Sequence, residues 1–445
     1  MFKRKDNDTM NPKPTFREAL SFWLKLGFIS FGGPAGQIAI MHEYLVERKK
    51  WISNSRFIHA LNYCMLLPGP EAQQLAIYNG WLLHGIRGGL VAGLFFILPS
   101  VFILLGLSVL YVLFGKILWF QALFEGLKPA VVAIVLFALY KIGKKSMKTF
   151  LHAGIALLSF ACIFIFNIPF PLIILSALVL AVVVVYLFPK MLKQKNSHEI
   201  LADDESQYFI NSLEAPQKFS WHPGSLALKT GCALALWFLP FVLIQVFAND
   251  TGFWNSLSFF FTKAALVTFG GAYAVLPYVA QVSVEKLHWL NSSQMMDGLA
   301  LGETTPGPLI MVLAYVGFMG SYGHFGASIL HGGIGLFTTV YFTFLPCFFF
   351  VLAGAPLVEG TRNFDKINGV ISLLSAAVAG VILNLAVYLG KSVLFGPLAQ
   401  LQSLHLFNLF WMLLSIVFLI RFKGNMLFWI GISACAGLVR FLLFP

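Results

Sequence analysis

The sequence predicts an all-α polytopic membrane protein, built from two related halves with interrupted helices at the core. Three observations predict this class. The 445 residues are 58% hydrophobic and only 11% charged, apolar runs recur along the whole chain, and the second half repeats motifs of the first. Because a soluble core cannot hide that much apolar surface, lipid must act as the solvent. Each run reaches about 18 residues, which lets a helix cross the hydrocarbon layer.

The apolar runs and their breakers indicate six membrane spans in the first half, near residues 18–40, 57–83, 88–114, 118–140, 150–167 and 170–188. Prolines 169 and 171 interrupt the last two, because they remove backbone donors that a continuous helix needs, so these spans should form a tight hairpin. A separate span near 226–247 precedes six more, near 254–278, 293–320, 327–354, 367–390, 403–421 and 425–444. We expect about thirteen spans.

A polar stretch divides the two halves. Residues 189–223 hold few apolar side chains and combine a lysine cluster with the acidic group at 203–205, which is typical of a linker. The predicted organisation is a first repeat at 1–188, a cytoplasmic linker plus one connecting helix at 189–253, and a second repeat at 254–445.

A shift of 238 positions aligns the two halves without a gap over about 45 residues. It places Phe31-Gly32-Gly33 on Phe269-Gly270-Gly271 and Pro68-Gly69-Pro70 on Pro306-Gly307-Pro308. Six spans return the chain to its starting side and the connecting helix moves it across, so the second repeat should be inverted. Inverted repeats whose broken helices meet near the midplane recur among secondary transporters.

The charges indicate how the chain sits in the membrane. The net charge of +12 comes from Lys and Arg in short polar breaks, a pattern typical of cytoplasmic loops, so we expect an inner-membrane protein with a cytoplasmic N-terminus. The basic cluster at residues 48–56 would fall outside under this arrangement. The first two spans could therefore be re-entrant, which would change the span count.

Several function classes find no support. There is no basic stripe with stacking aromatics for nucleic acid. The five cysteines are scattered singly, without His partners at ligand spacing, so we expect no metal, disulfide or cofactor. No nucleophile with its base stands at usable spacing, so we do not expect an enzyme.

The first signature places Gly32, Gly33 and Pro34 inside a membrane helix, with Gln37 one turn later. The helix should break there. Broken backbone is tolerated in a membrane only where protein or a water-filled cavity satisfies it. The second-half counterpart, Gly270-Gly271, lacks the proline, so a softer break is expected.

The second signature is the repeated Pro-Gly-Pro step, in which Pro70 or Pro308 can begin a new half-helix. Such a half-helix points free N–H groups and its positive dipole end at the break, which makes an anion site. Two of them could hold one tetrahedral oxyanion. Packing kinks without any ligand are the alternative interpretation.

Polar residues around these steps are further candidates. Thr304 and Thr305 could cap the second half-helix, and Gln73 and Gln74 lie in the first turn of the first. Glu71 would repel a dianion unless protonated, which suggests proton coupling.

Other charged residues have two interpretations each. Lys25 and Lys263 lie within apolar runs, where they either extend to the interface or lend positive charge to an anion path. Glu47 and Arg48 form either a surface ion pair or a gate. Two further gating or proton-coupling candidates precede the Pro-Gly-Pro steps, namely Asn62 and Glu303.

With these motifs in view, the sequence resembles the chromate ion transporter family in its long, two-domain form. The resemblance rests on FGGPAGQIA, RKKWI, ALNYCMLLPGPEAQQLA and GWLLHG in the first half, and on TFGGAYAVLPYV, DGLALGETTPGP and VGFMGSY in the second. Leu309, Ile310 and Met311 depart from the first half, which puts equal roles for the two halves in doubt.

The resemblance implies export of chromate from the cytoplasm, driven by membrane potential or proton exchange. Sulfate is an alternative anion, and a passive anion channel is a rival mechanism. The sequence leaves the oligomeric state open, with a homodimer as one alternative, and membrane lipid is the expected surrounding.

Overall fold

The structure is a computed structural model that describes residues 14–31, 33–188, 208–211, 223–248, 250–359, 365–395, 404–422 and 426–443. Within these ranges the regular structure is entirely helical. Seven helices are long and apolar enough to cross a membrane: Glu71–Phe114, Leu118–Ser146, Phe170–Leu187, Gly224–Phe247, Ile329–Pro356, Gly369–Phe395 and Met426–Leu443. Their outer faces carry exposed Leu, Val and Phe side chains, as expected for contact with lipid.

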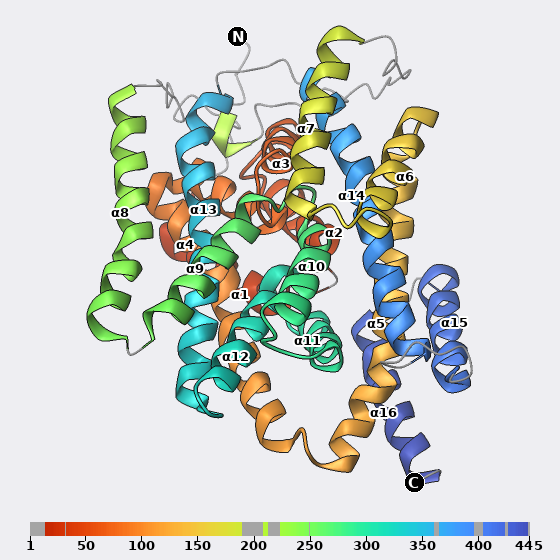
Figure 1. The fold of residues 1–445 in the computed structure, drawn as a ribbon. Coiled ribbons are helices and arrows are strands. Elements are labelled where there is room, and N and C mark those ends of the chain that lie inside the picture. Colours follow the sequence, from red (N-terminus) through yellow and green to blue (C-terminus); the bar gives the residue numbers. More distant parts are fainter. Residues whose placement is uncertain are drawn as a thin grey trace, which may run out of the picture.

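The two halves of the chain contribute similar orders of helices (Figure 1), except that the second half has a 3₁₀ turn and two separate helices where the first half has one long helix. The first half contains α1 (Phe16–Ile29), α2 (Gly33–His42), the π-helix η1 (Glu43–Arg48), α3 (Asn54–Cys64), α4 (Glu71–Phe114), α5 (Leu118–Ser146), α6 (Phe150–Phe164) and α7 (Phe170–Leu187). After α8 (Pro223–Phe247), the second half contains α9 (Thr251–Leu266), α10 (Ala272–Gln281), the π-helix η5 (Val282–Lys286), α11 (Ser292–Thr304), the 3₁₀ turn η6 (Leu309–Met311), α12 (Val312–His324), α13 (Ile329–Glu359), α14 (Asp365–Phe395), α15 (Leu406–Arg421) and α16 (Met426–Leu443).

The backbone repeats at the shift found in the sequence. Both π-helices occupy matching positions, and the residues that follow them, Lys50 and His288, have φ values of 49° and 51°. Positive φ is uncommon for residues other than glycine, so its recurrence 238 positions apart is a specific match. Trp51 and Trp289 likewise donate their backbone N–H to the carbonyls of Leu45 and Ser283.

None of the four spans expected near 18–40, 57–83, 254–278 and 293–320 is a single helix. At the start of α1, Glu18 pairs with Lys49 at the end of η1, with Nζ and Oε1 2.7 Å apart. The carbonyl of Pro14 lies 3.0 Å from His84 Nε2, at the end of the first part of α4. Both ends of segment 16–48, and the C-terminal end of segment 54–84, therefore lie on the same side of the molecule.

In the second half, the two ends of the matching stretch also lie together. Asp250, before α9, pairs with His324 at the end of α12, with Oδ2 and Nε2 2.8 Å apart. In the first half, the ion pair of Glu18 with Lys49 favours the re-entrant alternative, and the expected count of thirteen spans is not confirmed. The physical reason is that each glycine and Pro-Gly-Pro break interrupts a helix that was expected to cross.

Helix α4 is itself two helices that meet at an abrupt turn. His84 and Gly85 have non-helical angles, with φ of 65° at Gly85, and Gly80 packs backbone to backbone against Gly88. In the second half, the separate helices α12 and α13 pack together through Gly317 and the neighbourhood of Gly335. The two halves thus share one helical hairpin here.

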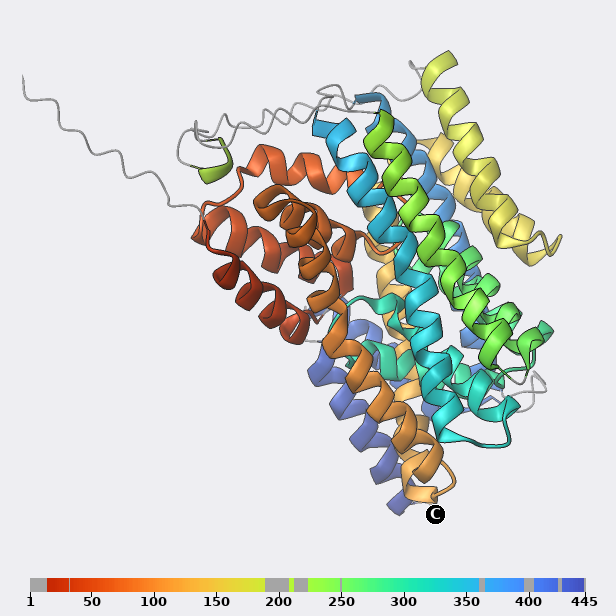
Figure 2. The same cartoon turned by 90° about the vertical axis from the view of Figure 1, so that its left-hand side faces the viewer.

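The two repeats are interlocked through their last helices. Helix α5 packs against α15 and α16 of the second half, whereas α14 packs against α6 and α7 of the first. Figures 1 and 2 show these hairpins at opposite ends of the bundle, with α6 and α7 high and α15 and α16 low in Figure 1. One close crossing joins α5 to α16 through Gly126 and Gly437, where small residues let the backbones touch.

The predicted linker falls almost wholly outside the described residues. Its described part is a 3₁₀ turn, Phe209–Asn211, which is tied to the first repeat. The backbone N–H groups of Phe209 and Ile210 donate to the carbonyls of Lys50 and Trp51, at 3.1 and 3.2 Å.

The crossing of α5 and α16 yields a stability prediction. A Cβ at position 437 would collide with the carbonyl of Ala122 and the backbone of Gly126, so Gly437→Ala should destabilise the protein by about 1–3 kcal/mol. In the same helix, Gly431 has open space around it, so Gly431→Ala should leave stability unchanged or slightly higher. Thermal unfolding in detergent compares the two, and equal melting temperatures would contradict the proposed tight crossing.

Candidate functional site

The four breaks of the two repeats meet at one place in the protein. The N–H of Gly69, in the first Pro-Gly-Pro step, donates to the carbonyl of Thr268 in the second half at 2.6 Å. The N–H of Gly307 donates to the carbonyl of Ser30 in the first half at 2.8 Å. These two bonds are related by the same shift of 238, so each Pro-Gly-Pro step joins the glycine break of the other repeat.

Glycine is required at these steps for two reasons. Gly69 and Gly307 have φ of 129° and 95°, which side chains of L-residues rarely allow. A Cβ at Gly69 would also meet Cys347 Sγ at 2.5 Å, and one at Gly307 would collide with Ser100. The backbone itself must therefore come close to its neighbours here.

The second glycine break is as sharp as the first. Gly33 has φ of 74°, while Gly270 and Gly271 have φ of 75° and 99°. The expectation of a softer break without proline is therefore wrong, because two consecutive glycines at positive φ reverse the backbone without help from a proline. Gly32 lies outside the described residues.

The helices that lead toward the breaks begin with side-chain caps, and three helices that lead away from them do not. The four caps are Thr15 for α1, Ser53 for α3, Asp250 for α9 and Asn291 for α11. By contrast, α4 begins after Pro70, α10 after Gly271 and η6 after Pro308, each without a side-chain acceptor for its first N–H groups. Uncapped helix starts from both repeats thus converge, which is the arrangement that favours an anion.

Thr304 and Thr305 do not cap the second half-helix, so that expectation is wrong. Their hydroxyls donate backward to the carbonyl of Leu301, at 2.8 and 2.6 Å, and so end α11. A threonine at the end of a helix readily bonds to a carbonyl one turn earlier, and this competes with capping the next helix.

Buried amide side chains surround the junction. Gln37 Nε2 donates to the carbonyl of Gly307 at 2.6 Å and to that of Ser30 at 3.2 Å, which ties the two repeats together. Gln74 Nε2 donates to the carbonyl of Pro68 at 2.7 Å. Gln73 is fully buried, yet within the described part of the chain neither atom of its amide has a partner. Such a group normally costs free energy, so Gln73 is a candidate for contact with a ligand or water.

Two carboxylates lie beside the breaks. Glu71 Oε1 lies 3.2 Å from where a Cβ of Gly271 would be, so the first turn of α4 faces the glycine break of the second repeat. Glu303 Oε1 accepts a hydrogen bond of 2.8 Å from the hydroxyl of Tyr273, which follows that break. The sequence indicated both carboxylates, but it did not indicate that both would lie near the break of the second repeat.

The remaining candidates lie away from the junction. Lys25 and Lys263 are exposed on the outer face of their helices. Arg48 pairs with Glu43 at 2.5 Å, and Glu47 lies 3.2 Å from His42, so Glu47 and Arg48 do not pair with each other. Asn62 is half-buried in α3. These positions support the interfacial interpretation for the two lysines.

Several residues at the junction escaped sequence analysis. Ser100 donates its hydroxyl to the carbonyl of Pro306, and the carbonyls of Ser30 and Thr268 receive the glycine N–H groups. Ser30 and Thr268 directly precede the FGG motifs at matching positions, which is a signal that the repeat alignment contained. Ser100 lies in an apolar run and no local pattern identifies it.

Comparison with known proteins assigns the family. The family model described as chromate transporter matches residues 17–184 and 255–438, one match in each half. The chain belongs to the chromate transporter family. It is therefore a multi-pass membrane protein of a transporter family, and the two matched regions contain the two sets of breaks.

Individual relatives are similar in sequence to this chain over most of their length. A chromate transport protein of Cupriavidus metallidurans is 29% identical over 93% of this chain and 90% of its own. A probable chromate transport protein of Synechococcus elongatus is 27% identical over 90% of this chain and 89% of its own. An uncharacterized transporter of Methanocaldococcus jannaschii is 24% identical over 87% of this chain and 88% of its own. No solved structure matches this chain.

Two neighbouring glutamines provide a prediction for this site. Gln73→Leu removes a buried amide without a protein partner, so the melting temperature should stay the same or rise, while anion transport should fall about tenfold or more. Gln74→Leu removes the donor to Pro68, so it should lower the melting temperature. Thermal unfolding and vesicle transport measure the two effects, and a destabilised Gln73→Leu with normal transport would contradict a ligand role.

Proposed function

We propose that this protein is a secondary transporter that exports chromate across the inner membrane, driven by membrane potential or proton exchange. The observation that carries the proposal is the convergence of uncapped helix starts, from both repeats, on a junction lined by buried amides. Chromate transport proteins that resemble the chain over nine-tenths of its length support chromate as the anion.

The chemistry of the junction suits a tetrahedral oxyanion. Such an anion offers only acceptors, and the first N–H groups of α4, α10 and η6 with the amide of Gln73 offer donors. The N–H groups of Gly69 and Gly307 are already engaged between the repeats, so they hold the junction together rather than bind the anion. In this proposal, Glu71 binds a proton when the anion is present, because an ionised carboxylate and a bound anion in one junction repel each other.

The proposed membrane arrangement has four crossings and two re-entrant segments in each repeat, with α8 as one further crossing. The total stays odd, so the two repeats are inverted, as in other secondary transporters. The re-entrant segments bring residues 48–56 to the side of the N-terminus. This basic cluster then supports a cytoplasmic N-terminus rather than opposing it. A homodimer remains compatible with this arrangement.

The energetics favour export. A negative charge that leaves an inside-negative cell releases roughly 2.3 kcal/mol per 100 mV. For a dianion, a potential of about 100 mV therefore supports a concentration ratio of about 1000 across the membrane. Uptake of the same ion would need accompanying cations.

Everted vesicles test the substrate and the direction. Vesicles that contain the protein should accumulate labelled chromate when an inside-positive potential is imposed, and empty vesicles should not. Sulfate added in excess should compete only if the junction recognises charge and shape alone. Transport of sulfate with no effect on chromate would overturn the assignment of chromate.

The carboxylate of Glu71 tests proton coupling. Glu71→Gln should remove the pH dependence of the maximal rate of chromate transport, because the amide mimics a permanently protonated carboxyl. The control is Glu285→Gln, an exposed carboxylate within the second π-helix, which should keep the wild-type pH profile of the maximal rate. Identical pH profiles for wild type and Glu71→Gln would exclude Glu71 from the coupling and favour a passive channel.

A further inference from the structure

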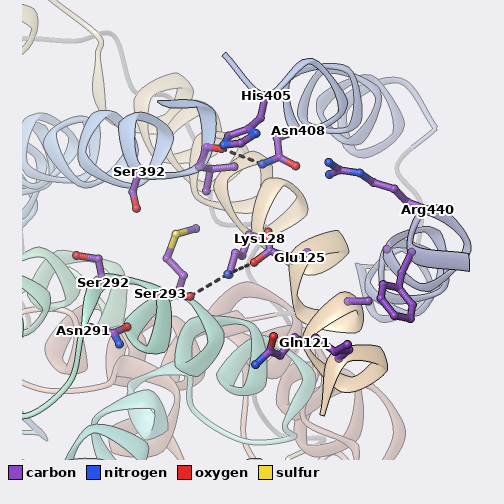
Figure 3. A pocket seen from close by; sticks show the side chains of 16 residues that line it. Gln121, Glu125, Lys128, Asn291, Ser292, Ser293, Ser392, His405, Asn408 and Arg440 are labelled. Carbon is purple, nitrogen blue, oxygen red and sulfur yellow. Dashed lines mark hydrogen bonds and ion pairs between the residues drawn. The ribbon is translucent and has the colours of Figure 1, made fainter. Parts of the chain in front are cut away.

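A pocket with several charged and polar lining residues lies between the two repeats, away from the helix breaks. It has a volume of about 790 Å³ and is lined by α5 of the first repeat and by α11, α14, α15 and α16 of the second. Its charged lining residues are Glu125, Lys128 and Arg440, with His405 and Asn408 on the side of α15 (Figure 3). Nothing in the proposed transport site uses this pocket.

Lys128 is the charged residue at the base of the pocket. Its Nζ lies 2.5 Å from Glu125 Oε1 on the same helix and donates to Ser293 Oγ on α11 at 2.9 Å. Only 13% of the Lys128 side chain is exposed, whereas half of the Glu125 side chain is. Figure 3 shows Lys128 between these two partners, with its amine facing the pocket.

Asp297 lies behind Lys128 and is buried. Its Oδ2 accepts a hydrogen bond of 2.8 Å from the hydroxyl of Tyr111, in the first repeat. Its Oδ1 is 4.0 Å from Lys128 Nζ and has no hydrogen-bond partner within the described part of the chain. A buried carboxylate oxygen without a donor is costly, and a proton is the smallest group that satisfies it.

The charges of the pocket are balanced only while Asp297 is ionised. Lys128 and Arg440 are positive, and Glu125 and Asp297 are negative, so the four charges cancel. The other titratable groups that face Asp297 are Tyr111 on α4 and Tyr315 on α12, both neutral phenols. When Asp297 binds a proton, the pocket gains one positive charge and Lys128 loses one of its two carboxylate partners.

We propose that this pocket is an anion vestibule, in which Lys128 binds a small oxyanion and protonation of Asp297 controls the affinity. Lys128 is the binding residue and Asp297 is a positioning residue that acts through it. The inference rests on the proposed transport function, because the vestibule serves the same anion.

The position of the pocket agrees with this role. Helix α11 begins at the pocket, with Ser292 and Ser293, and ends beside the second Pro-Gly-Pro step, with Thr304. The eleven helical steps from Ser293 to Thr304 cover about 16 Å, which is a short distance between a vestibule and a central site. The C-terminal helix α16 borders the pocket at the lower end of Figure 1, whereas α8 begins at the upper end, after the linker.

The test measures KM for chromate from the pocket side, in right-side-out vesicles with the membrane potential collapsed, across acid to alkaline pH. For the wild type, KM should rise with pH by up to about tenfold per unit. Asp297→Asn should give a low KM without that slope, because the pocket keeps its positive charge. Chromate itself gains a proton in this range, but equally for all variants, so their difference isolates the protein.

Matched variants separate the groups of the pocket. Glu125→Gln removes the exposed carboxylate on the same lysine and should lower KM while keeping the wild-type slope. His405→Gln removes the other pocket group that can gain a proton, and it should also keep the slope. Lys128→Gln should raise KM about tenfold or more at every pH, whereas Lys128→Arg should largely restore it.

The outcomes distinguish the two proposals. A wild type that moves no chromate in either vesicle orientation would overturn the proposed function. A wild type whose pH slope persists in Asp297→Asn, or disappears in His405→Gln, would overturn the vestibule alone. If Asp297→Asn does not fold, an unchanged KM in Lys128→Gln would overturn it instead.

Discussion

The structure depends on one constraint, which is that broken backbone inside a membrane must find hydrogen-bond partners within the protein. Each repeat breaks twice in its first 70 or so residues, and each uses the other repeat to satisfy part of its breaks. The Pro-Gly-Pro step of one repeat donates to the glycine break of the other, through Gly69 with Thr268 and Gly307 with Ser30. The two repeats are therefore obligatory partners at the centre, and their interlocked terminal hairpins extend that dependence to the periphery.

The same constraint separates structural groups from binding groups. The N–H groups of Gly69 and Gly307 join the repeats, so these two groups are not available to a ligand. The first N–H groups of α4, α10 and η6 have no side-chain cap, and Gln73 has no protein partner for either amide atom. A site made of such leftover donors recognises charge and shape, which is consistent with a family of oxyanion transporters. The vestibule at Lys128 and Asp297 would be a second place where charged residues from both repeats lie together.

Sequence reasoning located the breaks because glycine and proline act locally, on the backbone of their own residue. It also found the repeat, and the backbone angles of Lys50 and His288 match at the same shift. It raised re-entrant segments only as an alternative for the first two spans, since an apolar run of crossing length looks the same in both cases. The ion pair of Glu18 with Lys49 favours that alternative, and no local pattern links residues 31 positions apart.

The sequence by itself determined that the chain is a membrane protein, that it contains two related halves, and where its helices are interrupted. Composition and local backbone chemistry control these properties. Only the tertiary structure decided which donors remain free. Thr304 and Thr305 bond backward to Leu301, and Asp297 meets Tyr111 and Lys128 from distant helices. Hydrogen-bond partners are settled by three-dimensional proximity, and a buried polar atom becomes a candidate for binding only after every neighbour has been placed.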